Sequence, residues 1–174
     1  MRAVVFGLRN QKKNKMIILN LKGGLGNQLF QYAFGRKLAL KNGSALKLDI
    51  DGLERANAVG DIYRPFSLGH FAVVKEIATT EEVRRFKYPY GIFSKLWRFV
   101  RFRILKKTNT QWDPKHINKT GDMYLDGYWQ SPKYFEDIRD VLLKELRLTA
   151  AVSKIMTSYQ LKIAAGTSVS VHIR

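Results

Sequence analysis

The chain has 174 residues, of which 45% are hydrophobic, 12% aromatic and 26% charged, a composition typical of a globular protein with its own core and not of a disordered chain. It contains no cysteine, which excludes a disulfide framework and a thiolate metal site. Its formal net charge of +17 predicts an anionic partner, such as nucleic acid, an acidic membrane surface or a phosphorylated substrate.

Residues 1–15 contain a short apolar patch followed by a basic run. This segment is too short and too interrupted to form a signal peptide or a membrane span. We expect it to be a disordered extension, or an upstream start that was assigned in error. No stretch of the sequence reaches the roughly 18 consecutive apolar residues of a membrane-spanning helix, so we do not expect an integral membrane protein.

A turn rich in glycine follows the first predicted strand, which covers residues 16–21. Gly23, Gly24 and Gly26 allow the backbone to reverse tightly and allow another group to approach it closely. The simplest interpretation is a tight turn without a ligand. The functional interpretation is a binding loop, because such turns present backbone N–H groups at the start of a helix.

A helix is predicted over residues 28–41, with Asn27 as its N-cap and Asn42-Gly43 as its end. A second strand is predicted over residues 45–50. Strand, turn, helix and strand in this order predict a right-handed βαβ unit of a parallel sheet. We therefore expect a ligand at the carboxyl edge of that sheet.

A dinucleotide-binding oxidoreductase is one alternative for this unit. Its fingerprint G-x-G-x-x-G would require glycine where this chain has Leu29. Asp49, in contrast, follows the glycine turn at the sequence separation that is usual for the acidic residue that contacts the ribose. NAD binding thus stays an alternative that a thermal shift would reveal.

The middle of the chain combines a helix start with a strongly basic stretch. Thr79 and Glu82 have capping-box spacing, which predicts a helix from residue 79 or 80. Residues 84–107 contain nine Lys or Arg and no acid. On a helix their apolar residues would form a narrow stripe, which fits a solvated surface helix, contact with an anionic membrane or, as the weakest alternative, nucleic-acid binding.

Further strands and helices are predicted in the rest of the chain. Residues 123–129 are predicted to form a strand, and Ser131-Pro132 predicts the start of a helix. A further helix is expected over residues 150–165 and a Val-rich strand over residues 167–174. Because the sequence ends within that strand, we expect it to be a fragment of a longer protein.

Three segments together resemble one known family: KGGLGNQLFQYAFGRKLA (22–39), LDGYWQSPKYFEDI (125–138) and SVSVHIR (168–174). They are similar to the opening motif, the internal Gly-Tyr-Trp-Gln block and the start of the His-x-Arg-Arg-x-Asp motif of bacterial α-1,2-fucosyltransferases, glycosyltransferase family 11. The resemblance implies an α/β fold with a Rossmann-like parallel sheet, the N-terminal domain of a two-domain GT-B-type enzyme. Residues 16–166 would form that domain, and residues 167–174 the first strand of the donor-binding domain.

The resemblance also implies roles for individual residues. His172 and Arg174 match the first and third positions of the His-x-Arg-Arg-x-Asp motif, which binds the pyrophosphate of GDP-fucose. Arginine suits this role because its planar donors meet phosphate oxygens in pairs. The cleft loop that binds substrate would consist of Gly23, Gly24, Gly26, Asn27 and Gln28.

The catalytic residues stay open at this level. The D-x-D pattern of Asp49 and Asp51 is used by other glycosyltransferases to hold a divalent cation, but the resembled family works without metal, and the three histidines lie far apart in the sequence. No nucleophile elbow is present. Several acids are candidates for a general base and cannot be ranked without geometry: Asp49, Asp51, Asp61, Asp126 and Glu136.

The function implied by the resemblance is transfer of L-fucose from GDP-fucose to O2 of a galactose-containing acceptor. The reaction would be inverting and α-1,2-specific, with no metal and no cofactor beyond the donor substrate. The protein would be cytoplasmic, with residues 84–107 as the candidate contact with the cytoplasmic face of the membrane. This chain alone would be inactive. The alternative is a basic module that binds anionic membrane or nucleic acid through the same residues, nucleic acid being the less expected partner.

Overall fold

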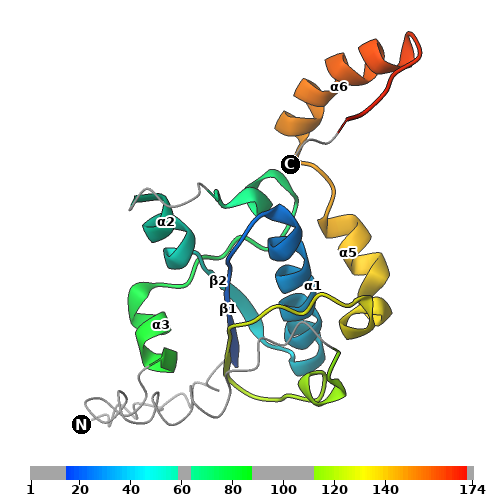
Figure 1. Cartoon of the computed structure of the whole chain (residues 1–174). Helices are drawn as coiled ribbons and strands as arrows, with labels where there is room; N and C mark the ends of the chain where they lie inside the picture. Colours follow the sequence, from blue (N-terminus) through cyan, green and yellow to red (C-terminus); the bar gives the residue numbers. More distant parts are fainter. Residues whose placement is uncertain (1–14, 59–63, 88–111, 172–174) are drawn as a thin grey trace, which may run out of the picture.

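The computed structural model describes residues 15–58, 64–87 and 112–171. Its centre is a three-stranded parallel sheet in the order β2-β1-β3, formed by β1 (Met16–Asn20), β2 (Ala45–Asp49) and β3 (Met123–Leu125). Figure 1 shows the sheet between helices. The α/β class and the Rossmann-like parallel sheet expected from the sequence are confirmed.

Helix α1 (Leu25–Asn42) connects β1 to β2 and covers one face of the sheet. The buried residues of α1 include Tyr32, Phe34 and Leu38, which pack with Leu19 of β1. Gly35 allows the close approach, because a Cβ there would lie 3.1 Å from the Leu19 side chain. Gly43 ends the helix with φ +57°, as the sequence predicts.

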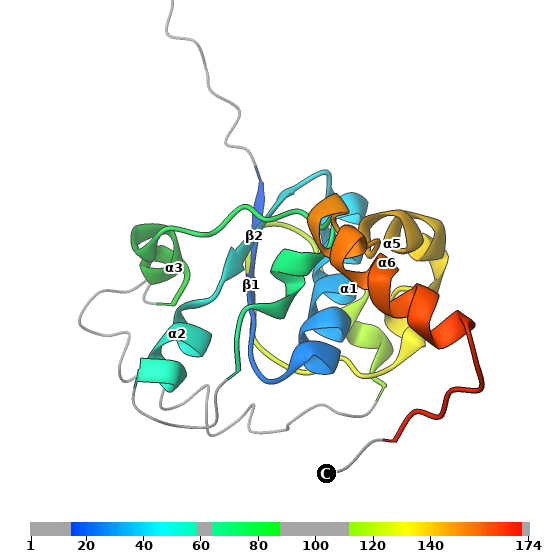
Figure 2. The same cartoon turned by 90° about the horizontal axis from the view of Figure 1, so that it is seen from above.

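The opposite face carries α2 (Asp51–Ala58) and α3 (Thr80–Lys87), which lie across the sheet from α1 in Figure 2. Ile18 of β1 packs there with Val83 of α3 in a small second core. The predicted capping box of α3 is confirmed: the Thr79 N–H donates to the Glu82 carboxylate at 2.9 Å, and the Glu82 N–H donates to Thr79 Oγ1 at 3.2 Å.

The helix expected from Ser131 is broken into shorter pieces. Two single 3-10 turns, η4 (Pro132–Tyr134) and η5 (Glu136–Ile138), precede α5 (Arg139–Glu145), and the Ser131 side chain makes no capping hydrogen bond. Tyr134 lies in the core beside Phe34 and Trp112 and is almost fully buried. Anchoring this ring to the core explains why the backbone turns here instead of continuing as one helix. Two further 3-10 turns, η1 (Ser67–His70) and η3 (Pro114–His116), lie in the connections.

Helix α6 (Ala150–Ala164) forms as predicted but projects from the rest of the molecule in Figure 1. Residues 167–171 are exposed and irregular, so the strand predicted over 167–174 is not formed by its described part. A strand requires a hydrogen-bonded neighbour, and these residues have none in the sheet. The domain division at residue 167 stays a prediction.

Two predicted segments lie largely outside the described residues: the extension 1–15, except its last residue, and nearly all of the basic stretch 84–107. Within the described ranges, no helix is long and apolar enough to cross a membrane.

Candidate functional site at the carboxyl edge of the sheet

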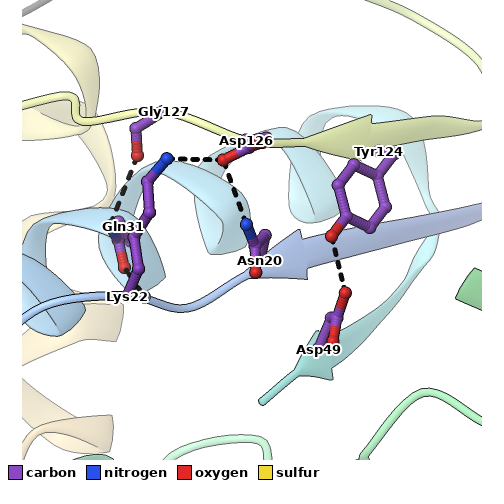
Figure 3. A network of polar contacts seen from close by, with 7 residues as sticks. All are labelled: Asn20, Lys22, Gln31, Asp49, Tyr124, Asp126 and Gly127. Atoms are coloured by element: carbon purple, nitrogen blue, oxygen red, sulfur yellow. Dashed lines mark hydrogen bonds and ion pairs between the residues drawn. The ribbon is translucent and has the colours of Figure 1, made fainter. Parts of the chain in front are cut away.

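A polar row crosses the three strands at their carboxyl ends. Asn20 of β1 stands in register with Asp49 of β2, and the register of β1 with β3 brings Asp126 beside Asn20 on the other side. Adjacent strands are about 4.8 Å apart, and side chains alternate between faces. Asp49, Asn20 and Asp126 therefore form a carboxylate–amide–carboxylate row on the face opposite α1 (Figure 3).

Asp126 is the hub of one half of this row. Lys22 Nζ donates to its Oδ1 at 2.6 Å, and Asn20 Nδ2 donates to the same oxygen at 3.0 Å. The Lys22 ammonium also lies 4.9 Å from the centre of the Tyr128 ring. In the described part of the chain no hydrogen bond reaches Asp126 Oδ2, and the side chain is 52% exposed. The carboxylate is thus oriented through one oxygen and open at the other.

Gln31 of α1 bonds to the backbone of Lys22 and to that of Gly127, the residue after Asp126. Its Oε1 accepts from the Lys22 backbone N–H at 3.1 Å, and its Nε2 donates to the Gly127 carbonyl at 3.3 Å. The Gln31 side chain has no exposed surface. A buried amide without partners is costly, so these two bonds set the position of the segment after β1 relative to the segment after β3.

Asp49 occupies the other end of the row and is 99% buried. Its Oδ2 accepts from Tyr124 Oη at 2.5 Å, and its Oδ1 accepts from the Asp51 backbone N–H at 3.1 Å. Burial, together with the hydrogen bond to Asp49, raises the pKa of Tyr124 above its usual value, so the phenol stays protonated and donates. Asp49 is engaged within the protein and not presented to a ribose or a cation.

A metal-binding D-x-D is not supported by this geometry. Asp51 begins α2, while Asp49 points to Tyr124. Among the described residues there is no group of three or more His, Cys, Asp or Glu side chains that could hold a metal ion.

The glycine turn is open at two of its three glycines. Gly24 is the N-cap of α1 and Gly26 lies in its first turn, and a Cβ on either would meet no atom within 4 Å. Gly23 is different, because its φ is +80° and a Cβ would lie 2.6 Å from Asn27 Nδ2. The turn therefore exposes the start of α1 beside the polar row.

The two residues after the turn bond to distant parts of the chain, and the N-cap predicted at Asn27 is wrong. Asn27 does not cap α1, which begins at Leu25; its Oδ1 accepts from Gln130 Nε2 at 2.7 Å and so ties the turn to the chain after β3. Gln28, which the resemblance places in the substrate-binding loop, is fully buried in this chain. It donates to the carbonyls of Gly23 and Pro65, each at 2.9 Å, and accepts from the Ser67 N–H.

The candidate acids can now be separated by their surroundings. Asp49 is buried, and Asp61 lies outside the described residues. Glu136 is exposed in η5, in the segment that leads to α5 and not at a strand end. Asp126 combines exposure, orientation and a place at the sheet edge. The predicted donor-binding residues His172 and Arg174 also lie outside the described residues.

Sequence reasoning did not find Asn20, Lys22, Gln31 or Tyr124. A signal existed for Asn20, since it is the polar residue that ends an otherwise apolar strand and therefore marks the carboxyl edge. Nothing local marks Gln31, because its two partners lie 9 and 96 residues away.

The chain is similar in sequence to a known enzyme. The chain is 27% identical over 162 residues to the alpha-1,2-colitosyltransferase of Escherichia coli, an alignment that covers 91% of this chain and 54% of that protein. The chain thus spans about half the length of the curated relative that it matches. No protein-family model and no solved structure matches. The chain is a distant homologue of an α-1,2-glycosyltransferase.

Proposed function

We propose that this chain is the acceptor-side part of an α-1,2-glycosyltransferase that moves L-fucose from GDP-fucose to O2 of a galactoside. The observation that carries the proposal is the similarity to an α-1,2-colitosyltransferase over 162 residues, an alignment that covers 91% of this chain. The glycine turn supports it, because an added Cβ at Gly24 or Gly26 would meet no atom within 4 Å, which leaves room for a sugar to approach the backbone there. In a complete enzyme this domain would face a second Rossmann-like domain in a GT-B arrangement.

The proposed reaction is a single displacement with inversion. O2 of the acceptor attacks C1 of the donor sugar, the C1–O bond to the β-phosphate breaks, and its electron pair leaves with GDP. The acceptor hydroxyl gives its proton to a carboxylate or to water. Positioning and stabilisation of the leaving pyrophosphate would supply most of the rate enhancement, His172 and Arg174 being the residues proposed to contact it.

A GDP-release assay tests the proposal. The 174-residue chain is compared with a chimera that continues past residue 174 into the C-terminal part of the E. coli relative, with the relative itself as the positive control. We expect turnover with a galactoside acceptor by the chimera and none by the short chain. Turnover by the short chain would refute the inactivity of this piece. A folded chimera that releases no GDP, from the fucose donor or from the corresponding colitose donor, would refute the transferase.

The second candidate function is binding of an anionic membrane surface through residues 84–107, with nine Lys or Arg and no acid. It predicts salt-sensitive binding to vesicles that contain phosphatidylserine. Neutralising Arg98, Arg101 and Arg103 should abolish that binding, whereas a matched change at Arg36, which pairs with Glu145, should not. Equal binding to neutral vesicles would exclude this function, and binding to RNA in place of vesicles would assign the stretch to nucleic acid.

A further inference from the structure

We infer that Asp126 is a sugar-binding residue, whose open carboxylate oxygen accepts a hydrogen bond from a hydroxyl of a neutral pyranoside at the carboxyl edge of the sheet. The inference rests on the proposed function for the choice of sugar, since the acceptor proposed there is a galactoside. It names a residue and a position that the proposed function does not require.

The Asp126 carboxylate is held through one of its two oxygens. Among the described residues, the two donors to Asp126 are Lys22 Nζ and Asn20 Nδ2, and both reach Oδ1. A carboxylate has about four acceptor positions, so this arrangement fixes its plane while Oδ2 keeps its acceptor capacity for a ligand. A surface ion pair whose purpose is stability contributes only about 0–1 kcal/mol and does not need a third group to orient it.

A buried side chain, Gln31, supports the segments that carry Lys22 and Asp126. Gln31 has no exposed surface, and both of its polar atoms form hydrogen bonds with the backbone, at Lys22 and at Gly127, the neighbour of Asp126. Gly127 itself has no room for a side chain, because a Cβ would lie 3.1 Å from the Trp129 ring. The two chain segments that bring Lys22 to Asp126 are therefore positioned from inside the core. Such preorganisation lowers the entropy lost when a ligand is bound.

The charges and polar groups of the row suit a neutral sugar better than a phosphate. The positive charge of Lys22 is compensated by Asp126, and Asp49 lies one strand beyond Asn20, so the row offers no excess positive charge for a phosphate. Carboxylates and side-chain amides suit the vicinal hydroxyls of a pyranose, because each accepts or donates to a neutral hydroxyl. Tyr128 and the Asn27–Gln130 pair extend the same polar surface toward the glycine turn.

The experiment uses the 174-residue chain and methyl β-galactoside as the probe, with the dissociation constant measured by saturation-transfer NMR titration. The variant is Asp126→Asn, which keeps the size and an oxygen for Lys22 and Asn20 but replaces the open acceptor. The matched control is Asp122→Asn: Asp122 also ties β3 to β1, accepting from the Met16 N–H at 2.9 Å, but at the opposite end of these strands.

We expect the wild type and Asp122→Asn to bind with the same affinity, and Asp126→Asn to bind at least about tenfold more weakly, with unfolding midpoints of the two variants close to each other. Unchanged binding in Asp126→Asn, equal loss in both variants, or no binding by the wild type would overturn the inference. If galactoside binding depends on Asp126 while the chimera transfers nothing, the sugar site stands and the transferase falls; the opposite pattern refutes only the sugar site.

Discussion

Gly23 shows how one residue of the turn is constrained by the backbone while its neighbours are not. Its φ of +80° lies in the left-handed region, and an added Cβ would collide with the Asn27 side chain. Gly26 lies in the first turn of α1 with open space around it. The sequence motif treats these glycines alike, but the structure assigns backbone strain only to Gly23.

We therefore predict opposite effects for two alanine substitutions. Gly23→Ala should lower the free energy of unfolding by about 1–3 kcal/mol, because it forces a side chain into a strained conformation. Gly26→Ala should be neutral or stabilising by up to about 1 kcal/mol, because alanine favours the helix. Urea denaturation of both variants measures the difference. Equal destabilisation by the two changes would show that Gly26 also has a packing role.

Polar side chains are the part of the site that the sequence predicts least well. The sequence indicates that Asn27 and Gln28 matter, but not what they do, since their partners Gln130 and Pro65 are distant in the chain. Propensity describes a residue and its near neighbours only. The role of a buried amide depends on which distant backbone groups the fold leaves without partners.

At the level of elements, the sequence predicts well wherever local chemistry and tertiary packing agree. The strands β1 and β2, the helix between them, the Gly43 end and the capping box of α3 all follow from periodicity and cap residues. Two predictions fail for tertiary reasons. The chain after Ser131 turns to bury Tyr134, and residues 167–171 have no strand beside them. Neither cause is visible in the local sequence.

The junction of α3 with β2 gives a prediction about pH. Lys47 Nζ lies 2.7 Å from Glu82 and 3.0 Å from Glu76, so these contacts hold α3 and the preceding loop on the sheet. The hydrogen bond from Lys47, followed by that from the Thr79 backbone, lowers the pKa of Glu82 below its usual value. The hydrogen bonds with Glu82 and Glu76 raise the pKa of Lys47.

The lowered pKa of Glu82 and the raised pKa of Lys47 determine how the stability changes with pH. A carboxyl whose pKa is lower in the folded state adds stability above its unfolded pKa of about 4.5, and this is lost as the pH falls through the folded value. Lys47 adds stability that is present below about pH 10.4 and lost as the pH rises further. We expect Glu82→Gln to lower the free energy of unfolding by about 1 kcal/mol at pH 7 and by less at pH 3. A difference from wild type that is the same at both pH values would contradict the ion-pair explanation.

At the scale of the whole molecule, α6 projects from the sheet and its covering helices, and its apolar side chains are exposed. Leu48 of β2 is fully buried in the main core. In α6, by contrast, Ile155, Tyr159 and Ile163 follow one another at helical spacing and are 64%, 57% and 58% exposed. An apolar stripe of this kind in solution promotes association between molecules and adds little to the stability of one chain.

The last prediction separates these two parts by substitution. When Ile155, Tyr159 and Ile163 are replaced together by Gln, which favours the helix, the free energy of unfolding should change by less than about 1 kcal/mol. Leu48→Ala, in contrast, should lower it by about 2–5 kcal/mol. Thermal and urea unfolding give the stabilities, and sedimentation at several concentrations reports whether the triple variant self-associates less than the wild type. A loss of several kcal/mol in the triple variant would mean that α6 packs on the core in solution, in which case its stripe belongs to the fold of the single chain.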